Sequence, residues 1–131
     1  MPVELEMVLR ILLAMALGAI IGFQRGKAEK PAGMRDLILI SAGSALFTVV
    51  SIYGFGADPA RVAAGIVTGI GFLGAGAIIR RGEGGVRGLT TAATIWITAG
   101  IGPAAGAGIY VIAAIATFLV LIVLLLPHRI A

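Results

Sequence analysis

The chain has 131 residues, of which 60% are hydrophobic and 12% are charged, and its mean hydropathy is +1.10. A soluble surface cannot be built from this composition, so a water-soluble globular domain is excluded. The formal net charge is +4. Because the basic residues lie in short clusters between apolar stretches, membrane topology explains them better than nucleic-acid binding, and we expect no nucleic-acid partner.

The first expected transmembrane segment covers residues 3–23. Glu6 and Arg10 lie four residues apart on one helical face near its start, where they can pair or reach the lipid headgroups. The Ala14-Met15-Ala16 triplet resembles an A-x-A signal-peptide cleavage site, but Glu4 and Glu6 replace the positive region that such a peptide needs. We therefore expect the first helix to remain in the mature protein.

Four more segments follow, at residues 37–53, 60–79, 89–101 and 104–126. Pro59 suits the first position of the third helix. The uncharged stretch from Gly88 to Pro127 is too long for one span, and its glycines and Pro103 divide it into the last two segments. The sequence thus predicts an all-α fold: one polytopic membrane helix bundle over residues 1–131, with about five transmembrane helices.

Basic residues predict how this bundle is oriented. The first connection contains Arg25, Lys27, Lys30 and Arg35, and the third contains Arg80, Arg81 and Arg87. Cytoplasmic connections are enriched in lysine and arginine, so both should be cytoplasmic. Five spans then give an N-out/C-in bundle. Four spans, with the last two segments forming one broken element, would put the C-terminus outside.

Glycine indicates how the helices pack. Small residues recur on one face of the first segment and on two faces of the third: Gly18, Gly22, Gly65, Gly69, Gly71, Gly74 and Gly76. Such residues let helix backbones approach closely, so we interpret them as helix-packing positions. A pore, an unwound ligand site or a homodimer interface is the functional alternative.

The main polar candidates gather at the start of the fourth segment. Arg87 precedes Thr90, Thr91 and Thr94, and a helix start beside an arginine can hold a carboxylate, a phosphate or a lipid headgroup. Helix capping by Thr90, with Arg87 anchored at the interface, is an equally good interpretation. Asp58 and Arg61 begin the third segment, where a plain helix cap is favoured over a ligand site.

Enzyme chemistry finds little support in the sequence. There is no cysteine, the only histidine is His128 near the C-terminus, and neither an HExxH motif nor a serine-histidine-aspartate set occurs. The glycine-rich residues 82–85 lack the order of a phosphate-binding loop, and we expect a flexible connection there. We therefore expect neither an enzyme, a metal site nor a cofactor.

Four phrases carry a family resemblance: KPAGMR at residues 30–35, GADPAR at 56–61, GIGFLGAG at 69–76 and VRGLTTAATIW at 86–96. In this order the chain resembles the MgtC/SapB family over about residues 4–122. The resemblance implies the hydrophobic N-terminal membrane domain of a multi-pass protein of the bacterial inner (cytoplasmic) membrane. Many members add a cytoplasmic C-terminal domain of ACT-like fold, which we do not expect within these 131 residues.

The resemblance also implies a function. The family is associated with growth in low magnesium, acid tolerance, virulence and inhibition of the membrane ATP synthase, and is not regarded as an established magnesium transporter. Its patterned polar positions correspond here to Arg25, Arg35, Asp58, Arg61, Arg87, Thr90 and Thr94. The sequence departs from the family pattern at two places, at Gln24 with Gly26 and at the Arg35-Asp36-Leu37 triplet. Both lie beside basic positions that would select the partner at the cytoplasmic face.

Two hypotheses follow from the sequence. The first is a regulator that contacts a membrane partner, such as the ATP synthase, through helix faces and cytoplasmic loops, with a homo-oligomer, most simply a dimer, expected in the bilayer. The second is a small transporter or channel for Mg²⁺ or another small ion or metabolite, with its site between helices. The sequence favours the first, because no ionisable residue is expected at the bilayer midplane.

Overall fold

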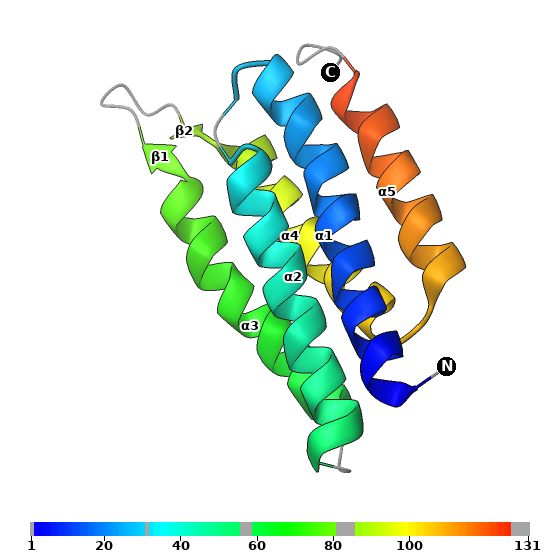
Figure 1. Ribbon diagram of the computed structural model, residues 1–131. Helices are drawn as coiled ribbons and strands as arrows, with labels where there is room; N and C mark the ends of the chain where they lie inside the picture. Colours follow the sequence, from blue (N-terminus) through cyan, green and yellow to red (C-terminus); the bar gives the residue numbers. More distant parts are fainter. Residues whose placement is uncertain (1, 31, 56–58, 81–85, 127–131) are drawn as a thin grey trace.

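The computed structural model describes residues 2–30, 32–55, 59–80 and 86–126 as an antiparallel helix bundle. Its elements are α1 (Val3–Lys27), α2 (Met34–Val50), the π-helical turn η1 (Ser51–Phe55), α3 (Pro59–Ala77), β1 (Ile79–Arg80), β2 (Val86–Arg87), α4 (Leu89–Gly106) and α5 (Tyr110–Leu124). Successive helices alternate in direction, so α1 begins at one end of the bundle and α5 finishes at the other (Figure 1). The predicted all-α bundle of five helices is confirmed for the described residues.

Helix length and composition agree with a membrane protein. Three helical stretches are long and apolar enough to cross a bilayer: Val3–Lys27, Met34–Gly54 and Pro59–Ala77. α4 has 18 residues and α5 is a shorter apolar helix of 15 residues. The five helices alternate in direction, as successive membrane crossings do, while the N-out/C-in orientation stays a prediction.

The last two segments are separate helices, as predicted, but the predicted position of the break between them is wrong. Gly100, Gly102 and Pro103 all lie inside α4, which runs on to Gly106 instead of ending at residue 101. The helix stops where Gly108 adopts φ +85° and the Ile109 N–H donates a 2.8 Å hydrogen bond to the Ala104 carbonyl. This left-handed glycine ending closes the helix, so the last helix begins at Tyr110 and not at residue 104.

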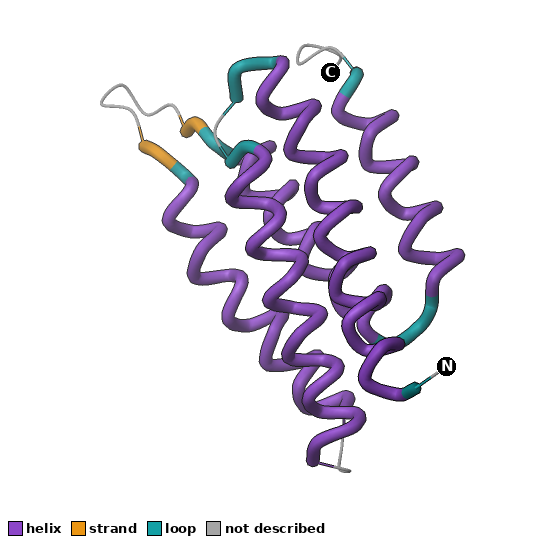
Figure 2. The backbone as a smooth tube through the Cα atoms, in the orientation of Figure 1, coloured by secondary structure: helices purple, strands orange, loops and turns teal. Residues whose placement is uncertain are grey.

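The connection between α3 and α4 contains the two short strands. They pair antiparallel, with Ile79 opposite Arg87 and Arg80 opposite Val86. Figure 2 shows both strands at the end of the bundle where α1 finishes and α2 starts. Residues 82–85, expected to be a flexible connection, lie outside the described residues.

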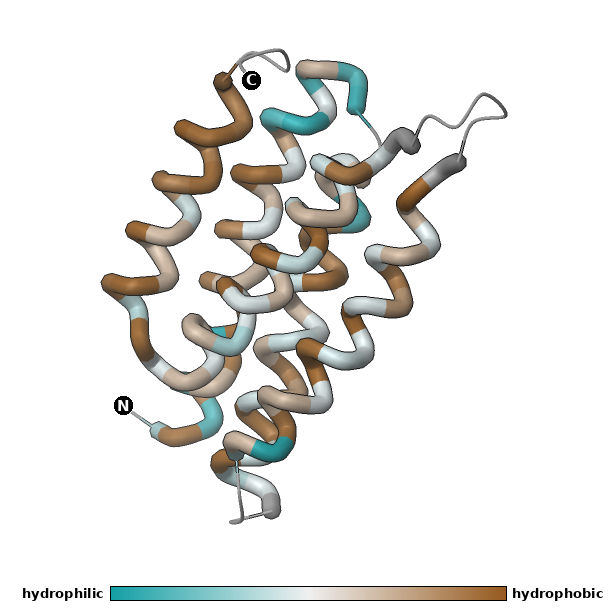
Figure 3. Tube along the Cα trace, turned by 180° about the vertical axis from the view of Figure 1, so that it is seen from behind, coloured by the Kyte–Doolittle hydropathy of each residue, from teal (hydrophilic) through white to brown (hydrophobic). Residues whose placement is uncertain are grey.

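The core lies between α1, α2 and α4, and the other two helices are peripheral. Ile21, Leu37 and Ile101, one from each central helix, are almost completely buried. By contrast, α3 buries only Ile70 and Gly74. α5 is mostly apolar along its length in Figure 3 and exposes large side chains, as a lipid-facing helix requires.

Close helix approach is concentrated in the three central helices. A Cβ atom at Gly18 would lie 2.6 Å from the Leu37 carbonyl oxygen, and one at Gly106 would lie 2.8 Å from the Ala45 carbonyl oxygen. Gly22 and Gly102 approach the backbones of Met34 and Ser41 still more closely. Glycine is needed at all four positions because backbone atoms, which cannot rotate away, occupy the space of a side chain.

The glycines of α3 are placed differently. A Cβ atom at Gly65, Gly69, Gly71 or Gly76 would meet nothing within 4 Å, and one at Gly74 would make only ordinary contacts with Ala92, the nearest at 3.8 Å. Except for Gly74, these glycines therefore lie on the surface of the bundle. Close packing within one chain would instead require them to lie inside it.

Candidate functional site

The start of α4 is positioned by a glycine that no other residue could replace without strain. Gly88 has φ +89°, and a Cβ atom there would collide with the Ala77 carbonyl oxygen at the end of α3. α3 and α4 therefore meet at this end, beside the last turn of α1. The threonine-rich first turns of α4 begin directly after Gly88.

Arg25 reaches this helix start from inside the bundle. It was expected in a cytoplasmic connection, but it belongs to the last turn of α1 and is only 2% exposed. Its guanidinium Nη2 donates to Oγ1 of the buried Thr91. Thr94 is also buried, and its hydroxyl donates a 2.7 Å hydrogen bond to the Thr90 carbonyl oxygen. Arg25 and Thr91 are thus brought together, while Thr90 is exposed and Thr94 bonds within its own helix.

The other predicted site residues do not join this group in one site. Arg35 is exposed in the first turn of α2, at the same end of the bundle. Arg61 is exposed at the start of α3, at the opposite end. Asp58 lies outside the described residues, and for Arg87 the description covers only its backbone in β2. The carried-over positions therefore divide between the two ends of the helices.

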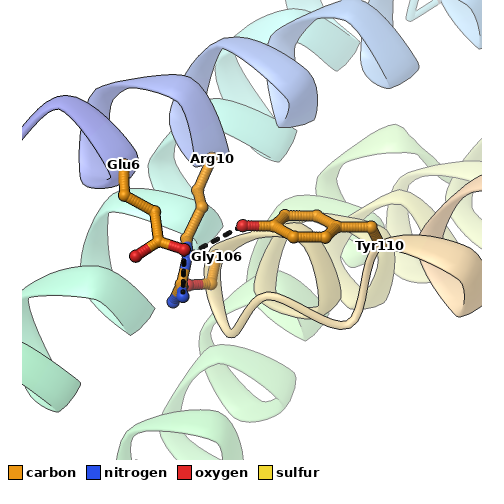
Figure 4. Close-up of polar contacts among 4 residues, drawn as sticks. All are labelled: Glu6, Arg10, Gly106 and Tyr110. Atoms are coloured by element: carbon orange, nitrogen blue, oxygen red, sulfur yellow. Dashed lines mark hydrogen bonds and ion pairs between the residues drawn. The ribbon is translucent and has the colours of Figure 1, made fainter. Parts of the chain in front are cut away.

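A second polar cluster, centred on Arg10, occupies that opposite end. Arg10 Nε donates to the Tyr110 hydroxyl at 3.1 Å, and Nη1 donates to the Gly106 carbonyl at 3.1 Å (Figure 4). Nη2 lies 3.2 Å from the Glu6 carboxylate, which is the pairing the sequence suggested. The guanidinium also lies 5.3 Å from the centre of the Tyr53 ring. Arg10 thereby joins α1 to η1, to the end of α4 and to the start of α5.

Sequence reasoning missed most of this cluster. The spacing of Glu6 and Arg10 was a usable signal because both lie on one helix. Tyr110 is 100 residues away from Arg10 along the chain, and nothing local marks it as a partner. The amphipathic character of tyrosine at a helix start was the only hint.

Side chains able to ligate a metal are dispersed in the part of the chain that the structure describes. Within them, no group of three or more histidine, cysteine, aspartate or glutamate side chains could hold a metal ion. An open groove of about 250 Å³ lies where α1 meets the start of α2, lined by Gly22, Phe23, Gly26, Lys27 and Met34. Its lining is mostly apolar, so the groove suits contact with lipid or with an apolar protein surface.

Known proteins resemble the chain over most of its length. The YhiD protein of Escherichia coli, whose name proposes it as a magnesium transporter, is 44% identical over 133 residues, covering 95% of this chain and 61% of YhiD. Protein MgtC of Salmonella typhimurium is 47% identical over 114 residues, covering 87% of this chain and 49% of MgtC. Protein SrpB of Synechococcus elongatus is 44% identical over 129 residues, covering 88% of this chain and 71% of SrpB.

The chain matches only part of the length of these relatives. The chain spans about half of the Salmonella protein and about three fifths of the Escherichia coli one. No solved structure matches it significantly. The model of the MgtC family matches residues 11–131, which include all the described helices except the first turns of α1. On the strength of that match and of relatives above 40% identity, the chain belongs to the MgtC family.

Proposed function

We propose that this chain is a bacterial inner-membrane regulator that acts by lateral contact with another membrane protein. The observation that carries the proposal is the exposed glycine face of α3, defined by Gly65, Gly69 and Gly76. Spacings of four and seven residues place these glycines on one line along the helix. Small residues on a membrane helix let a second helix approach its backbone closely.

Helix energetics support this use of α3. Glycine in a helix interior costs about 1 kcal/mol relative to alanine. Inside the bundle that cost is offset at Gly18 and Gly102 by close packing, but the glycine face of α3 touches nothing in the described chain. A partner helix seated there would supply the missing contacts. Phe72, which is 81% exposed beside this face, would add an aromatic anchor.

Basic residues support a polar contact at one end of the same partner. Lys27, Lys30 and Arg35 are exposed where α1 passes into α2, the end at which α3 finishes. If the predicted orientation holds, this end faces the cytoplasm. The family resemblance names the membrane ATP synthase as the candidate partner, and low-magnesium or acid stress as the setting.

A photo-crosslinking pair tests the proposal in native membranes. We would replace Phe72 of α3 with p-benzoylphenylalanine and, as the matched control, Phe118 of α5, which is 62% exposed. The Phe72 variant should give one adduct of defined mass, identified by mass spectrometry as an ATP synthase membrane subunit, and Gly69→Leu should abolish it. Lipid adducts alone at both positions, or the same protein adducts at both, would refute the proposal.

Transport is the second candidate function. It is favoured by the name of the YhiD relative and by the buried hydroxyls of Thr91, Thr94 and Thr98, which face the interior of the bundle. Uptake of Mg²⁺ into liposomes containing the purified chain would test it. Flux that Thr98→Val abolishes would establish a transporter, whereas no flux from folded protein would dismiss this candidate.

A further inference from the structure

The groove between the last turns of α1 and the start of α2 has a closed floor and an open end. At the floor, Gly22 lies so near the backbone of Met34 that a Cβ atom on Gly22 would collide with it. One turn later, Gly26 is exposed, and a Cβ atom there would meet nothing within 4 Å. The groove of about 250 Å³ therefore has free space beside Gly26.

The walls of this groove are apolar, and a cation lies at its rim. Phe23 is 55% exposed and Met34 is 40% exposed, so both walls face the surroundings of the bundle. The Lys27 Nζ atom lies 5.6 Å from the centre of the Phe23 ring, which keeps the ammonium group at the groove. An apolar channel with an ammonium group at one end matches a phospholipid, which has an acyl chain below a phosphate.

The position of the groove along α1 also fits a lipid. The apolar stretch long enough to cross a bilayer ends at Lys27, so the groove occupies the last turns of the span. Within the hydrocarbon layer no water is present to fill a surface groove, and acyl chains take its place. A lysine at the end of such a span reaches the level of the headgroup phosphates.

Charge at this end of the bundle favours an anionic headgroup. Among the side chains that the structure describes, this end carries four basic and two acidic residues: Arg25, Lys27, Lys30, Arg35, Glu29 and Asp36. The described side chains at the opposite end are balanced, with Arg10 and Arg61 against Glu4 and Glu6. Asp36 lies about 200° around α2 from Met34, on the side away from the groove wall.

We infer that this groove binds an anionic phospholipid, with one acyl chain between Phe23 and Met34 and the headgroup phosphate at the Lys27 ammonium group. A zwitterionic lipid fits the same walls but brings its own cation close to Lys27, so it binds less tightly. The groove covers less than two turns of α1, which is too short to seat a partner helix along its length. The inference does not depend on what docks against α3, because no α3 residue lines the groove.

Native mass spectrometry of the full chain in detergent provides the first test, with palmitoyl-oleoyl phosphatidylglycerol compared against palmitoyl-oleoyl phosphatidylcholine. The unmodified chain should retain one phosphatidylglycerol in preference to phosphatidylcholine. Gly26→Leu fills the groove and should abolish this preference, whereas Gly71→Leu, the same change at an exposed and open position of α3, should preserve it. Equal retention of the two lipids, or a preference that survives Gly26→Leu, would overturn the inference.

A pair of lysine variants separates a defined site from general attraction to a basic surface. Lys27→Gln should weaken phosphatidylglycerol binding by about five-fold, the usual effect of one lysine near an anionic lipid surface. Lys30→Gln removes the same charge at the same end but outside the groove lining, and should leave binding nearly unchanged. Equal weakening in both variants contradicts a site at Lys27. Displacement of the lipid by glycerol phosphate alone also contradicts it, because that would identify a site for free phosphate.

Photo-crosslinking in native membranes identifies the occupant directly. Replacing Phe23 with p-benzoylphenylalanine keeps an aromatic wall, and the same replacement of Phe118 on the exposed face of α5 is the control. Adducts at position 23 should have the masses of anionic phospholipids, while adducts at position 118 should follow the bulk lipid composition. The same lipid classes at both positions, or a protein adduct at position 23, would show that the groove does not select an anionic lipid.

Discussion

Adding one methyl group at Gly18 or at Gly69 should have opposite effects on stability. At Gly18, the new Cβ atom would lie 2.6 Å from the Leu37 carbonyl oxygen, whereas ordinary contact begins at 3.4 Å, so α1 and α2 must separate by roughly 0.8 Å. No flexible side chain can absorb the change, because the nearest atoms are backbone atoms and the Ser41 Cβ. At Gly69 nothing lies within 4 Å, and the methyl group meets open space.

The magnitude follows from two terms. Overpacking a close interface costs about 1–3 kcal/mol, and the upper part of that range, about 2–3 kcal/mol, applies at Gly18 because the clash is with backbone atoms. Replacing glycine by alanine within a helix recovers about 1 kcal/mol. Gly18→Ala should therefore lower the free energy of unfolding by about 1–2 kcal/mol. Gly69→Ala has only the second term and should raise it by about 1 kcal/mol.

Reversible unfolding of the purified protein in mixed micelles, followed by circular dichroism as the denaturing detergent is increased, measures both variants under one condition. The difference between the two free energies is the informative quantity because both substitutions add the same methyl group. The reasoning would be refuted if both variants shifted in the same direction by similar amounts. It would also fail if Gly18→Ala matched the unmodified protein.

Three further predictions concern the polar clusters and the start of α4. Arg10→Ala removes two hydrogen bonds and an ion pair and should cost about 2–4 kcal/mol in the same unfolding assay. Tyr110→Phe removes one hydrogen bond and should cost about 1 kcal/mol. Equal losses of stability in the two variants would mean that Arg10 does not join the helices as described. Thr91→Val takes a hydrogen-bond partner from the buried Arg25 and should lower the Tm measurably, and an unchanged Tm would show that this contact is unimportant. Gly88→Ala should cost about 1–3 kcal/mol and reduce the folded yield on size-exclusion chromatography, and full recovery of folded protein would count against the left-handed start of α4.

The sequence predicted the helices better than their ends. Hydropathy and the spacing of charged clusters were sufficient to find five helices, because lipid solvation acts on each segment by its own composition. The predicted break at residues 100–106 failed because Gly102 and Pro103 were weighed as features of an isolated helix. In the bundle, the backbone of α2 packs directly against Gly102 and Gly106, so those glycines serve contact and not termination.

The candidate sites were predicted less well, for a different reason. Arg25 was assigned to a cytoplasmic connection because it stands in a basic cluster, yet the packing of α1 beside α4 buries it against Thr91. The Arg10 cluster depends on Tyr110, whose proximity exists only after folding. Whether a glycine face turns inward, as at Gly18, or outward, as at Gly69, likewise depends on which helices are central.

The arginines of α1 also impose an order on biosynthesis. Arg25 contacts Thr91, which lies 66 residues later in the chain, and Arg10 contacts Gly106, which lies 96 residues later. When α1 leaves the ribosome and enters the bilayer, neither partner has been made. Because both arginines lie near the ends of α1, their long side chains can reach the lipid headgroups while the rest of the protein is synthesised. Both contacts can form only after α4 has been inserted, so the α1–α2 pair lacks them until then.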